Sequence, residues 1–344
     1  MLPLSASGGR TPHLSCLLYL PDLSAGCFHM AKKILLSIFA LLAIAGIAIY
    51  FLLRSYPVPE KSEYSLDLEK IRSGVKASDN LPIAINAVVI AGNSFPELVS
   101  TAGRGFTPEQ RVIMALQIVF EDSYIIIDTA HDQEQHRKVF GEEAPFDLNR
   151  YEALQQALLG AREIYVSHTH GDHIGGIAQS ANIEQLLPKL HVNKEQFEQM
   201  RKESEITGTS ERAVGFQTSD LTPVRQFDYQ TTKEIAPGVI AIKAIGHTPG
   251  NQMFYIRLKN GKDYLYVGDV IWSYHNITDQ KSRPYFVSNI VLGEDSRAVA
   301  HQLRSLINAK DDITFIIAHD KARLTQQFNT SLFGTEFRIS PTVQ

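Results

Sequence analysis

Apolar positions along the chain fall into one long run near the N-terminus and many short runs after it. The stretch from Ile34 to Leu53 contains no charged residue, and Lys32 and Lys33 stand directly before it. A helix needs about twenty apolar residues to cross a bilayer, and leading lysines are typical of a secretory segment. We therefore expect a signal anchor or transmembrane helix over residues 30–54. A cleaved signal peptide, with its cleavage site between Ala43 and Gly46, is the alternative.

The segments on either side of this helix differ from it in composition. Residues 1–29 are rich in Pro, Ser, Gly and Leu, and Met30 begins a sequence typical of a natural start. We expect residues 1–29 to be a non-native or disordered leader. Residues 55–81 are charged and contain proline, which favours a linker with a helix around Leu66 to Ser73.

The side of the membrane on which the rest of the chain lies is a separate question. Long domains are translocated largely regardless of the charges that flank the anchor. We therefore expect a membrane-anchored protein whose main domain is exported to the periplasmic or extracellular side. A domain that faces the cytoplasm is the alternative.

Short apolar runs alternate with segments of helical periodicity over residues 82–344. Turn-forming residues bound these runs, as at Lys259 to Lys262, where the sequence predicts a hairpin. The pattern predicts an α/β domain over 82–344. We expect strands at Ile85–Ile90, Val112–Phe120, Tyr124–Ile127, Glu163–Val166, Leu190–Val192, Val239–Ile245, Gln252–Leu258, Asp263–Val267 and Ile313–Ile317. We expect helices at Leu148–Leu159 with Asp147 as its cap, from Gly176 to Leu187, at Lys194–Glu203 and at Asp295–Ala309.

The overall composition narrows the class of protein. The 344 residues are 44% hydrophobic and 20% charged, as in ordinary globular proteins. The net charge of -4 gives no sign of a general affinity for nucleic acid, so we expect no nucleic-acid partner. Both cysteines, Cys16 and Cys27, precede the apolar run. The domain therefore has no thiolate for a metal and no structural disulfide.

Candidate chemistry is concentrated in one short stretch, Ser167 to Gly176, which reads SHTHGDHIGG. It follows the predicted strand Glu163–Val166, and residues two apart in extended chain point to the same side, so His168 and His170 can reach one metal ion. We expect Gly171 to allow a sharp turn that directs Asp172 and His173 to a second ion, and Gly175-Gly176 to allow close backbone packing where the following helix begins. A polar surface loop is the alternative. Imidazole and carboxylate ligands suit zinc, and also iron or manganese.

Three further candidate ligands lie far downstream. His247 follows a predicted strand within Gly-His-Thr-Pro-Gly, Asp269 follows another within Gly-Asp, and His319 follows the last one. Asp128 closes an earlier strand. Because α/β folds place active sites at strand ends, we expect these side chains to meet.

This constellation closely resembles the metallo-β-lactamase-fold hydrolases over Ile83 to His319. The H-x-H-x-D-H signature, the later G-H-T-P-G, the strand-ending G-D and the final histidine carry the resemblance. It implies an αββα sandwich of two mixed sheets flanked by helices, with a binuclear metal site along one edge. One departure is Asn251, where many relatives have histidine; we expect Asn251 to orient a neighbouring loop without binding metal.

The resemblance implies a role for each candidate ligand. It implies that two divalent ions bind, most commonly zinc. The first ion would be held by His168, His170 and His247, and the second by Asp172, His173 and His319, with Asp269 as the bridge. The resemblance also implies that Asp128 steadies the histidine loop; a simple turn-forming role is the alternative.

The expected reaction follows from such a centre. Two divalent ions lower the pKa of a shared water. The resulting hydroxide would attack the carbon of a carbonyl group or the phosphorus of a phosphoryl group. Asp172 could orient this nucleophile and pass its proton to the leaving group, which makes Asp172 and Asp269 the candidate catalytic residues. The layout most resembles the lactonase and esterase branches, so we expect a small-molecule lactone or ester as substrate. A phosphodiesterase, a β-lactam hydrolase and a catalytically silent metal-binding scaffold are the alternatives.

Several residues outside the ligand set also bear on the site. We expect His131 and His136 to be exposed to solvent, and the polar stretch Thr207 to Gln230 to be an irregular loop near the site. Four aromatic residues are candidates for the pocket, although plain packing is the commoner role of such residues. They are Tyr266, Trp272, Tyr274 and Tyr285.

Overall fold

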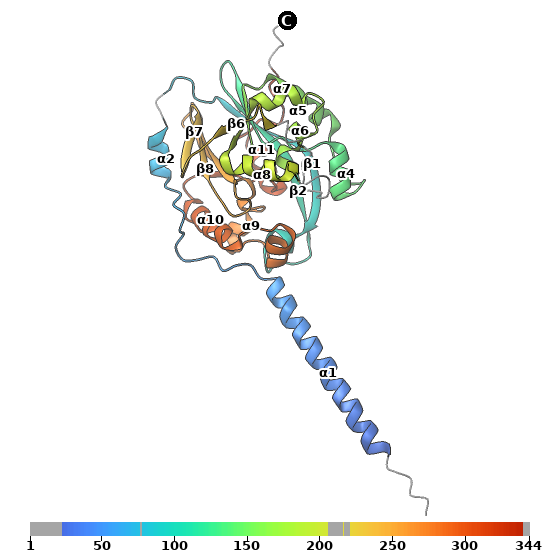
Figure 1. The fold of residues 1–344 in the computed structure, drawn as a ribbon. Helices are drawn as coiled ribbons and strands as arrows, with labels where there is room; N and C mark the ends of the chain where they lie inside the picture. Colours follow the sequence, from blue (N-terminus) through green and yellow to red (C-terminus); the bar gives the residue numbers. More distant parts are fainter. Residues whose placement is uncertain (1–22, 76–77, 206–215, 217–220, 340–344) are drawn as a thin grey trace, which may run out of the picture. The chain divides into compact units, whose positions relative to one another are not determined.

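The computed structural model describes residues 23–75, 78–205, 216 and 221–339. The chain divides into two units, Met1–Tyr50 and Phe51–Gln344. The first consists, among the described residues, of helix α1 (Leu23–Leu52), whose segment Lys32–Leu52 is by length and composition able to cross a membrane (Figure 1). Most of the predicted leader, residues 1–22, lies outside the described residues.

The second unit contains two β-sheets. The first sheet has the strand order β1-β2-β3-β4-β5-β6, antiparallel at β1-β2-β3 and parallel from β3 onward. Its strands are β1 (Ala84–Pro96), β2 (Pro108–Val119), β3 (Tyr124–Ile127), β4 (Glu163–Tyr165), β5 (Leu190–Asn193) and β6 (Arg225–Phe227). The sheet is therefore mixed, as the resemblance implied.

The second sheet has the order β11-β10-β9-β8-β7. Its strands pair antiparallel except for β10 and β11, which run parallel. They are β7 (Thr232–Ala236), β8 (Val239–Lys243), β9 (Gln252–Arg257), β10 (Asp263–Tyr266) and β11 (Thr314–Ile316). The predicted hairpin between β9 and β10 is confirmed, with Gly261 at a φ of 84° that favours glycine.

Helices cover the outer faces of both sheets (Figure 1). The main helices of this unit are α4 (Gln133–Phe140), α5 (Leu148–Gly160), α6 (Gly171–Ala178), α7 (Ile183–Leu186), α8 (Lys194–Glu205), α9 (His275–Asp279), α10 (Ser296–Ala309) and α11 (Lys321–Asn329), of which α11 packs against the cluster between the sheets. Asp147 and Asp295 cap α5 and α10 by accepting hydrogen bonds from backbone N–H groups, at 3.0 Å each, as predicted for Asp147.

Three apolar clusters define the layers of the sandwich. The side chains of Met114 and Leu116 on β2 meet Phe254 and Ile256 on β9 between the two sheets. A second cluster joins the outer face of the first sheet to α5 and α6, and a third joins the outer face of the second sheet to α10. Strand β2 contributes to two clusters because alternate side chains point to opposite faces. The αββα sandwich predicted from the resemblance is confirmed.

The stretch expected to be a linker, 55–81, belongs to the second unit, and its described residues contact the sandwich at several points. Helix α2 (Leu68–Gly74) lies where a helix was predicted, and its Ile71 is buried beside α10. Upstream of it, the Ser62 hydroxyl donates a hydrogen bond of 2.7 Å to the carbonyl of His301. These residues therefore add to the outer layer of the second sheet.

The structure corrects two details of the predicted elements. Helix α6 begins at Gly171, four residues before the predicted start, so Asp172 and His173 lie in its first turn. Within the predicted irregular loop Thr207 to Gln230, strand β6 extends the first sheet as its edge strand. Residues 206–215 and 217–220 of that loop lie outside the described residues.

Candidate metal centre

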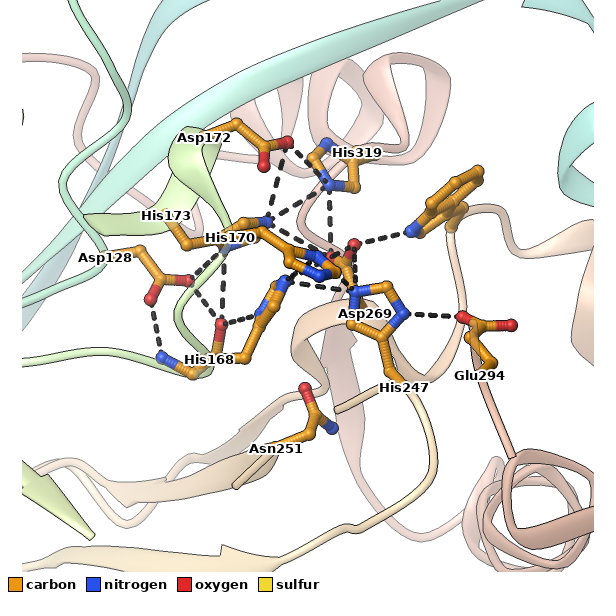
Figure 2. Close-up of polar contacts among 12 residues, drawn as sticks. Asp128, His168, His170, Asp172, His173, His247, Asn251, Asp269, Glu294 and His319 are labelled. Atoms are coloured by element: carbon orange, nitrogen blue, oxygen red, sulfur yellow. Dashed lines mark hydrogen bonds and ion pairs between the residues drawn. The ribbon is translucent and has the colours of Figure 1, made fainter. Parts of the chain in front are cut away.

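The candidate ligands meet at one edge of the sandwich, each just beyond a strand end (Figure 2). His168 lies in the loop after β4, and His170 is the N-terminal cap of α6. His247 follows β8, Asp269 lies in a short 3₁₀ turn after β10, and His319 follows β11. Segments more than a hundred residues apart in sequence thus supply one site.

Three imidazoles form the first group. The Nε2 atom of His168 lies 3.1 Å from Nδ1 of His170, and Nε2 of His247 lies 3.1 and 2.9 Å from these same two atoms. Ligands at about 2.0–2.1 Å from a tetrahedral zinc ion are separated by roughly 3.3 Å. The triangle therefore has the dimensions of one face of a tetrahedral metal site.

A carboxylate and two imidazoles form the second group. The Nε2 atoms of His173 and His319 lie 3.4 Å apart, and Oδ2 of Asp172 lies 3.7 Å from each of them. His173 and His319 are buried, whereas the side chain of Asp172 keeps 26% of its surface exposed. A ligand atom on Asp172 can thus face both the group and the solvent.

Asp269 lies between the two groups and faces both. Its Oδ2 atom is 3.4 Å from Nε2 of His247, and its Oδ1 atom is 3.1 and 3.4 Å from Nε2 of His319 and His173. The side chain is almost fully buried, yet Oδ1 accepts no hydrogen bond from any described residue. A buried carboxylate oxygen without a donor is costly unless a cation lies beside it.

In His247 and His319, the hydrogen bond made by Nδ1 determines that Nε2 is the nitrogen that faces the centre. Nδ1 of His247 donates to Glu294 at 2.5 Å, and Nδ1 of His319 donates to the carbonyl of Val112 at 2.8 Å. Since a neutral imidazole has one N–H, Nε2 of each ring then presents a lone pair to the centre. These nitrogen lone pairs and the Oδ1 atom of Asp269 are all electron-rich and repel one another. Divalent cations bound between them would remove this repulsion.

Asp128 organises the loop that carries the first histidines. Its carboxylate accepts from the backbone N–H of Ser167 at 2.6 Å, the hydroxyl of Ser167 at 2.8 Å, Nδ1 of His173 at 2.8 Å and the hydroxyl of Tyr266 at 2.6 Å. Asp128 is completely buried and has a φ of 62°, which few residues other than glycine adopt. The structure therefore favours the supporting role over that of a simple turn former.

The family assignment rests on a match over most of the domain. Residues 107–319 match the model of the metallo-beta-lactamase superfamily. The chain belongs to this superfamily. The matched range contains every candidate ligand from His168 to His319, and it ends at the last of them.

Solved structures share the metallo-beta-lactamase fold at low sequence identity. A quorum-quenching N-acyl homoserine lactone lactonase aligns over 77% of this chain and 99% of its own, with a TM-score of 0.55 and 14% identity. A Bacillus thuringiensis protein variant with N-decanoyl-L-homoserine bound at its active site aligns over 72% of this chain and 96% of its own, with a TM-score of 0.54 and 14% identity. A dizinc quorum-quenching lactonase aligns over 71% of this chain and 91% of its own, with a TM-score of 0.50 and 17% identity. No curated protein matches the chain in sequence.

Two glycines allow α6 to approach the loop after β3. A Cβ atom at Gly176 would lie 2.0 Å from the carbonyl oxygen of Thr129, and one at Gly175 would lie 2.8 Å from Cβ of His131. A Cβ at Gly171 would meet nothing within 4 Å, and Gly171 does not have a positive φ. The close packing predicted for Gly175-Gly176 is confirmed. At Gly171 the backbone turns from the extended His170 into α6 and directs Asp172 and His173 to the second group, as predicted, but in a conformation that does not require glycine.

A second network, which the sequence did not reveal, supports the other side of the metallo-beta-lactamase centre. Glu294 accepts from His247 and also pairs with the buried Arg283, whose Nη2 donates to the carbonyl of Asp269 at 3.0 Å. The indole N–H of Trp272 donates to Oδ2 of Asp269 at 2.6 Å. Trp272, a predicted pocket candidate, thus contacts the candidate bridge directly.

The other aromatic candidates have different positions. Tyr266 is buried and donates a hydrogen bond to Asp128. It therefore supports Asp128 and is not accessible to a substrate. Tyr274 packs under the guanidinium of Arg323, at 4.5 Å from its ring centroid. Asn251 donates from Nδ2 to the carbonyl of Ala244 at 2.8 Å and so closes the turn that contains His247. This agrees with the loop-orienting role predicted for Asn251.

His131 and His136 are buried, so their predicted exposure is wrong. Nε2 of His131 lies 2.9 Å from Nδ1 of His136, and Phe140 and Phe146 pack around the pair. Burial lowers the pKa of His131 to about 4. The sequence around them looks solvent-facing because the burial of the two rings depends on contacts with α6 and with Phe146, which lie farther along the chain.

The electrostatics of the two groups differ. Burial, with His247 nearby, lowers the pKa of His170 to about 3. Burial alone would lower the pKa of His173, but the carboxylates of Asp128 and Asp172 help to hold it well above its ordinary value. Burial alone would raise the pKa of Asp172, but His173 and its neighbours lower it to about 2.

Proposed function

We propose that this chain is a membrane-anchored, binuclear metal-dependent hydrolase that cleaves a lactone or ester bond in a small molecule. The observation that supports the binuclear arrangement most strongly is Asp269, which directs one carboxylate oxygen to each group of ligands. One ion would be held by His168, His170 and His247. The other would be held by Asp172, His173 and His319.

Each part of this centre has a chemical task. Two bound divalent ions, zinc in this proposal, would supply an ionised water at neutral pH and polarise the substrate oxygen. Asp172 is accessible to solvent and adjacent to the second group, so it would orient the attacking water and transfer its proton to the leaving group. Asp269 would hold the two halves at a fixed separation.

The choice of an ester or lactone over other bonds has two supports. The candidate ligands include no cysteine, and the solved structures that share the fold include lactonases. These structures are too distant in sequence to transfer a substrate, so the bond type is part of the proposal.

The membrane anchor is proposed from α1 alone. Its segment Lys32–Leu52 is long enough and apolar enough to span a bilayer, and its large apolar side chains are exposed. We expect the hydrolase domain to be exported. A reporter fused after Gln344 that is active only in the cytoplasm would contradict export.

The hydrolase proposal is tested with the full chain purified in detergent. We expect about two equivalents of divalent metal per chain and turnover of a lactone and aryl-ester panel that exceeds turnover of bis-nitrophenyl phosphate. Asp269→Ala should lower hydrolysis by about a thousandfold or more and lower the metal content, because the bridge is lost. Asp122→Ala, at an exposed turn, is the matched control and should keep both. Full turnover by Asp269→Ala would refute the binuclear mechanism.

A further inference from the structure

Arg111 lies beside the second group of ligands. It is on β2, where the backbone of the next residue, Val112, donates to the carbonyl of His319 at 3.2 Å and accepts from its imidazole at 2.8 Å. Arg111 itself forms a β-bridge with Asp320. The same strand that holds His319 therefore also fixes the position of Arg111.

The side chain of Arg111 packs against the ring that contacts the candidate bridge. Its guanidinium carbon lies 3.9 Å from the ring centroid of Trp272 and 5.7 Å from that of Phe95. Trp272 in turn donates from its indole N–H to Asp269 at 2.6 Å. One aromatic ring thus separates the guanidinium from the centre where hydrolysis is proposed.

The guanidinium of Arg111 lacks the partners that a buried arginine normally has. Arg111 is only 6% exposed, yet among the described residues it forms no hydrogen bond from its side chain and no ion pair, and its Nε atom is buried without an acceptor. Stacking on an aromatic ring offsets only part of the cost of removing this charge from water. The planar array of N–H donors is left free to bind an oxyanion.

Arg283 provides the contrast within the same structure. Its guanidinium also stacks on Trp272, at 4.6 Å, and its side chain is buried as well. Arg283, however, pairs with Glu294 and donates to the carbonyl of Asp269. Of these two arginines on one ring, only Arg111 has no acceptor among the described residues, so a purely structural role explains Arg283 better than Arg111.

We propose that Arg111 binds an oxyanion group of the substrate, a carboxylate or a phosphate, next to the second group of ligands. This proposal rests on the proposed hydrolase function and narrows its substrate class to esters or lactones that bear such a group. Arg111 is a specificity-determining residue in this scheme, because the anion it binds is not the bond that breaks.

The first experiment compares two substrates that differ only in charge. The nitrophenyl monoester of glutaric acid carries a free carboxylate, and its carboxamide counterpart has the same length without the charge. We expect the wild type to prefer the carboxylate in kcat/KM by about 10- to 100-fold, as for a charge-assisted hydrogen bond. In Arg111→Met the ratio should fall to about one, and in Arg111→Lys it should be intermediate, because lysine keeps the charge but not the planar fork.

Arg323→Met is the matched control. Arg323 also stacks on an aromatic ring, that of Tyr274, but it lines a hollow of about 690 Å³ that Arg111 does not line. Its substitution should leave the ratio of the two substrates as in the wild type. A wild-type ratio near one, together with no fluorescence response of the wild type to acetate or to phosphate in the second experiment, overturns the proposal even if Arg111→Met fails to fold. An equal loss on both substrates in a folded Arg111→Met also overturns it, because that result indicates a role in positioning Trp272 alone.

The second experiment does not depend on hydrolysis. Trp272 is the single tryptophan of the chain, so its fluorescence reports on the ring that Arg111 contacts. Acetate and inorganic phosphate, titrated separately into the full chain, should change this fluorescence in the wild type and not in Arg111→Met. The stronger of the two responses identifies the oxyanion.

These readouts separate the two proposals. If no ester or lactone is cleaved but an oxyanion changes the fluorescence of the wild type only, the hydrolase proposal fails and the anion site stands. If the esters are cleaved but the fluorescence responses of wild type and Arg111→Met are the same, the anion site is refuted and the hydrolase proposal stands.

Discussion

The two candidate metal positions differ in charge and in what holds them. The first consists of three imidazoles, and its support comes from Glu294 and from the turn that Asn251 closes. The second contains a carboxylate, and its support comes from the backbone of β2 and from Asp128, which also holds Ser167 before His168. The first is therefore held mainly from loops, and the second from the packed core of the first sheet.

This difference separates metal binding from folding. Carboxylate ligands add negative charge and suit harder divalent ions, whereas an all-imidazole set is neutral and suits zinc. Damage to the support of the second position should cost folding stability as well as metal. Damage to the support of the first position should cost mainly metal. The following changes test this contrast, beginning with the largest expected effect.

Asp128→Ala should destabilise the domain by about 3–5 kcal/mol, because it leaves a buried imidazole, two hydroxyl groups and a backbone N–H without their acceptor. Urea unfolding of the metal-free protein measures this free energy. Asp122→Ala, at an exposed turn, is the control and should change it little. If the two variants unfold alike, Asp128 does not stabilise the second position.

Gly176→Ala should destabilise the domain by about 1–3 kcal/mol, because its methyl group would overlap the carbonyl of Thr129 and push α6 outward. Gly171→Ala is the matched control on the same helix. It should be neutral or stabilise by up to about 1 kcal/mol, since nothing lies near its Cβ. The reverse order of stability would show that α6 does not depend on close packing at Gly176.

Glu294→Gln should weaken metal binding at the first position by about 10- to 100-fold, because His247 loses its anionic partner. Competition with a chromophoric chelator measures the affinity. The second position should keep its affinity, and an equal loss at both positions would remove the contrast between them.

The pH dependence of metal binding should be the mildest effect. The raised pKa of His173 means that a metal must displace a proton at the second position, so affinity there should rise with pH by up to about tenfold per unit. The lowered pKa of His170 leaves that ring neutral, so the dependence at the first position should be shallower. Titrations between about pH 6 and pH 8 would compare the two.

The same proton affects the metal-free fold. Because the folded-state pKa of His173 is raised, its contribution to stability is complete below the unfolded value of about 6.5 and is lost as the pH rises through the folded value. Metal-free protein that becomes more stable as the pH rises above neutrality would contradict this assignment.

The sequence was sufficient to predict the ligands because their pattern is local. His168, His170, Asp172 and His173 occupy six positions, and the other three each follow an apolar run that reads as a strand. The nearly continuous apolar run of β2 and the turn before β10 likewise predicted strands in both sheets. These features depend on neighbouring residues and on little else.

The supporting residues could not be predicted in the same way. Glu294 precedes the cap of α10 and looks like an ordinary exposed residue, and only the fold brings it to His247. Arg111 lies on an otherwise apolar strand without any motif. The start of α6 was misplaced because glycine pairs favour turns in sequence, whereas here they serve close packing within a helix.

The parallel pairing of β10 and β11 has a consequence for how such a chain can vary. Tyr266 is in register with Ile316, and Asp269 and His319 each follow three residues later. The backbone hydrogen bonds between β10 and β11 thus fix the position of Asp269, the candidate bridge, relative to His319. Residues 267–268 and 317–318 are the two short segments between these strands and their ligands. An insertion in either segment would shift one ligand relative to the other by about 3.3 Å per residue. Length changes should therefore be tolerated in the surface connections elsewhere and rejected in these two segments.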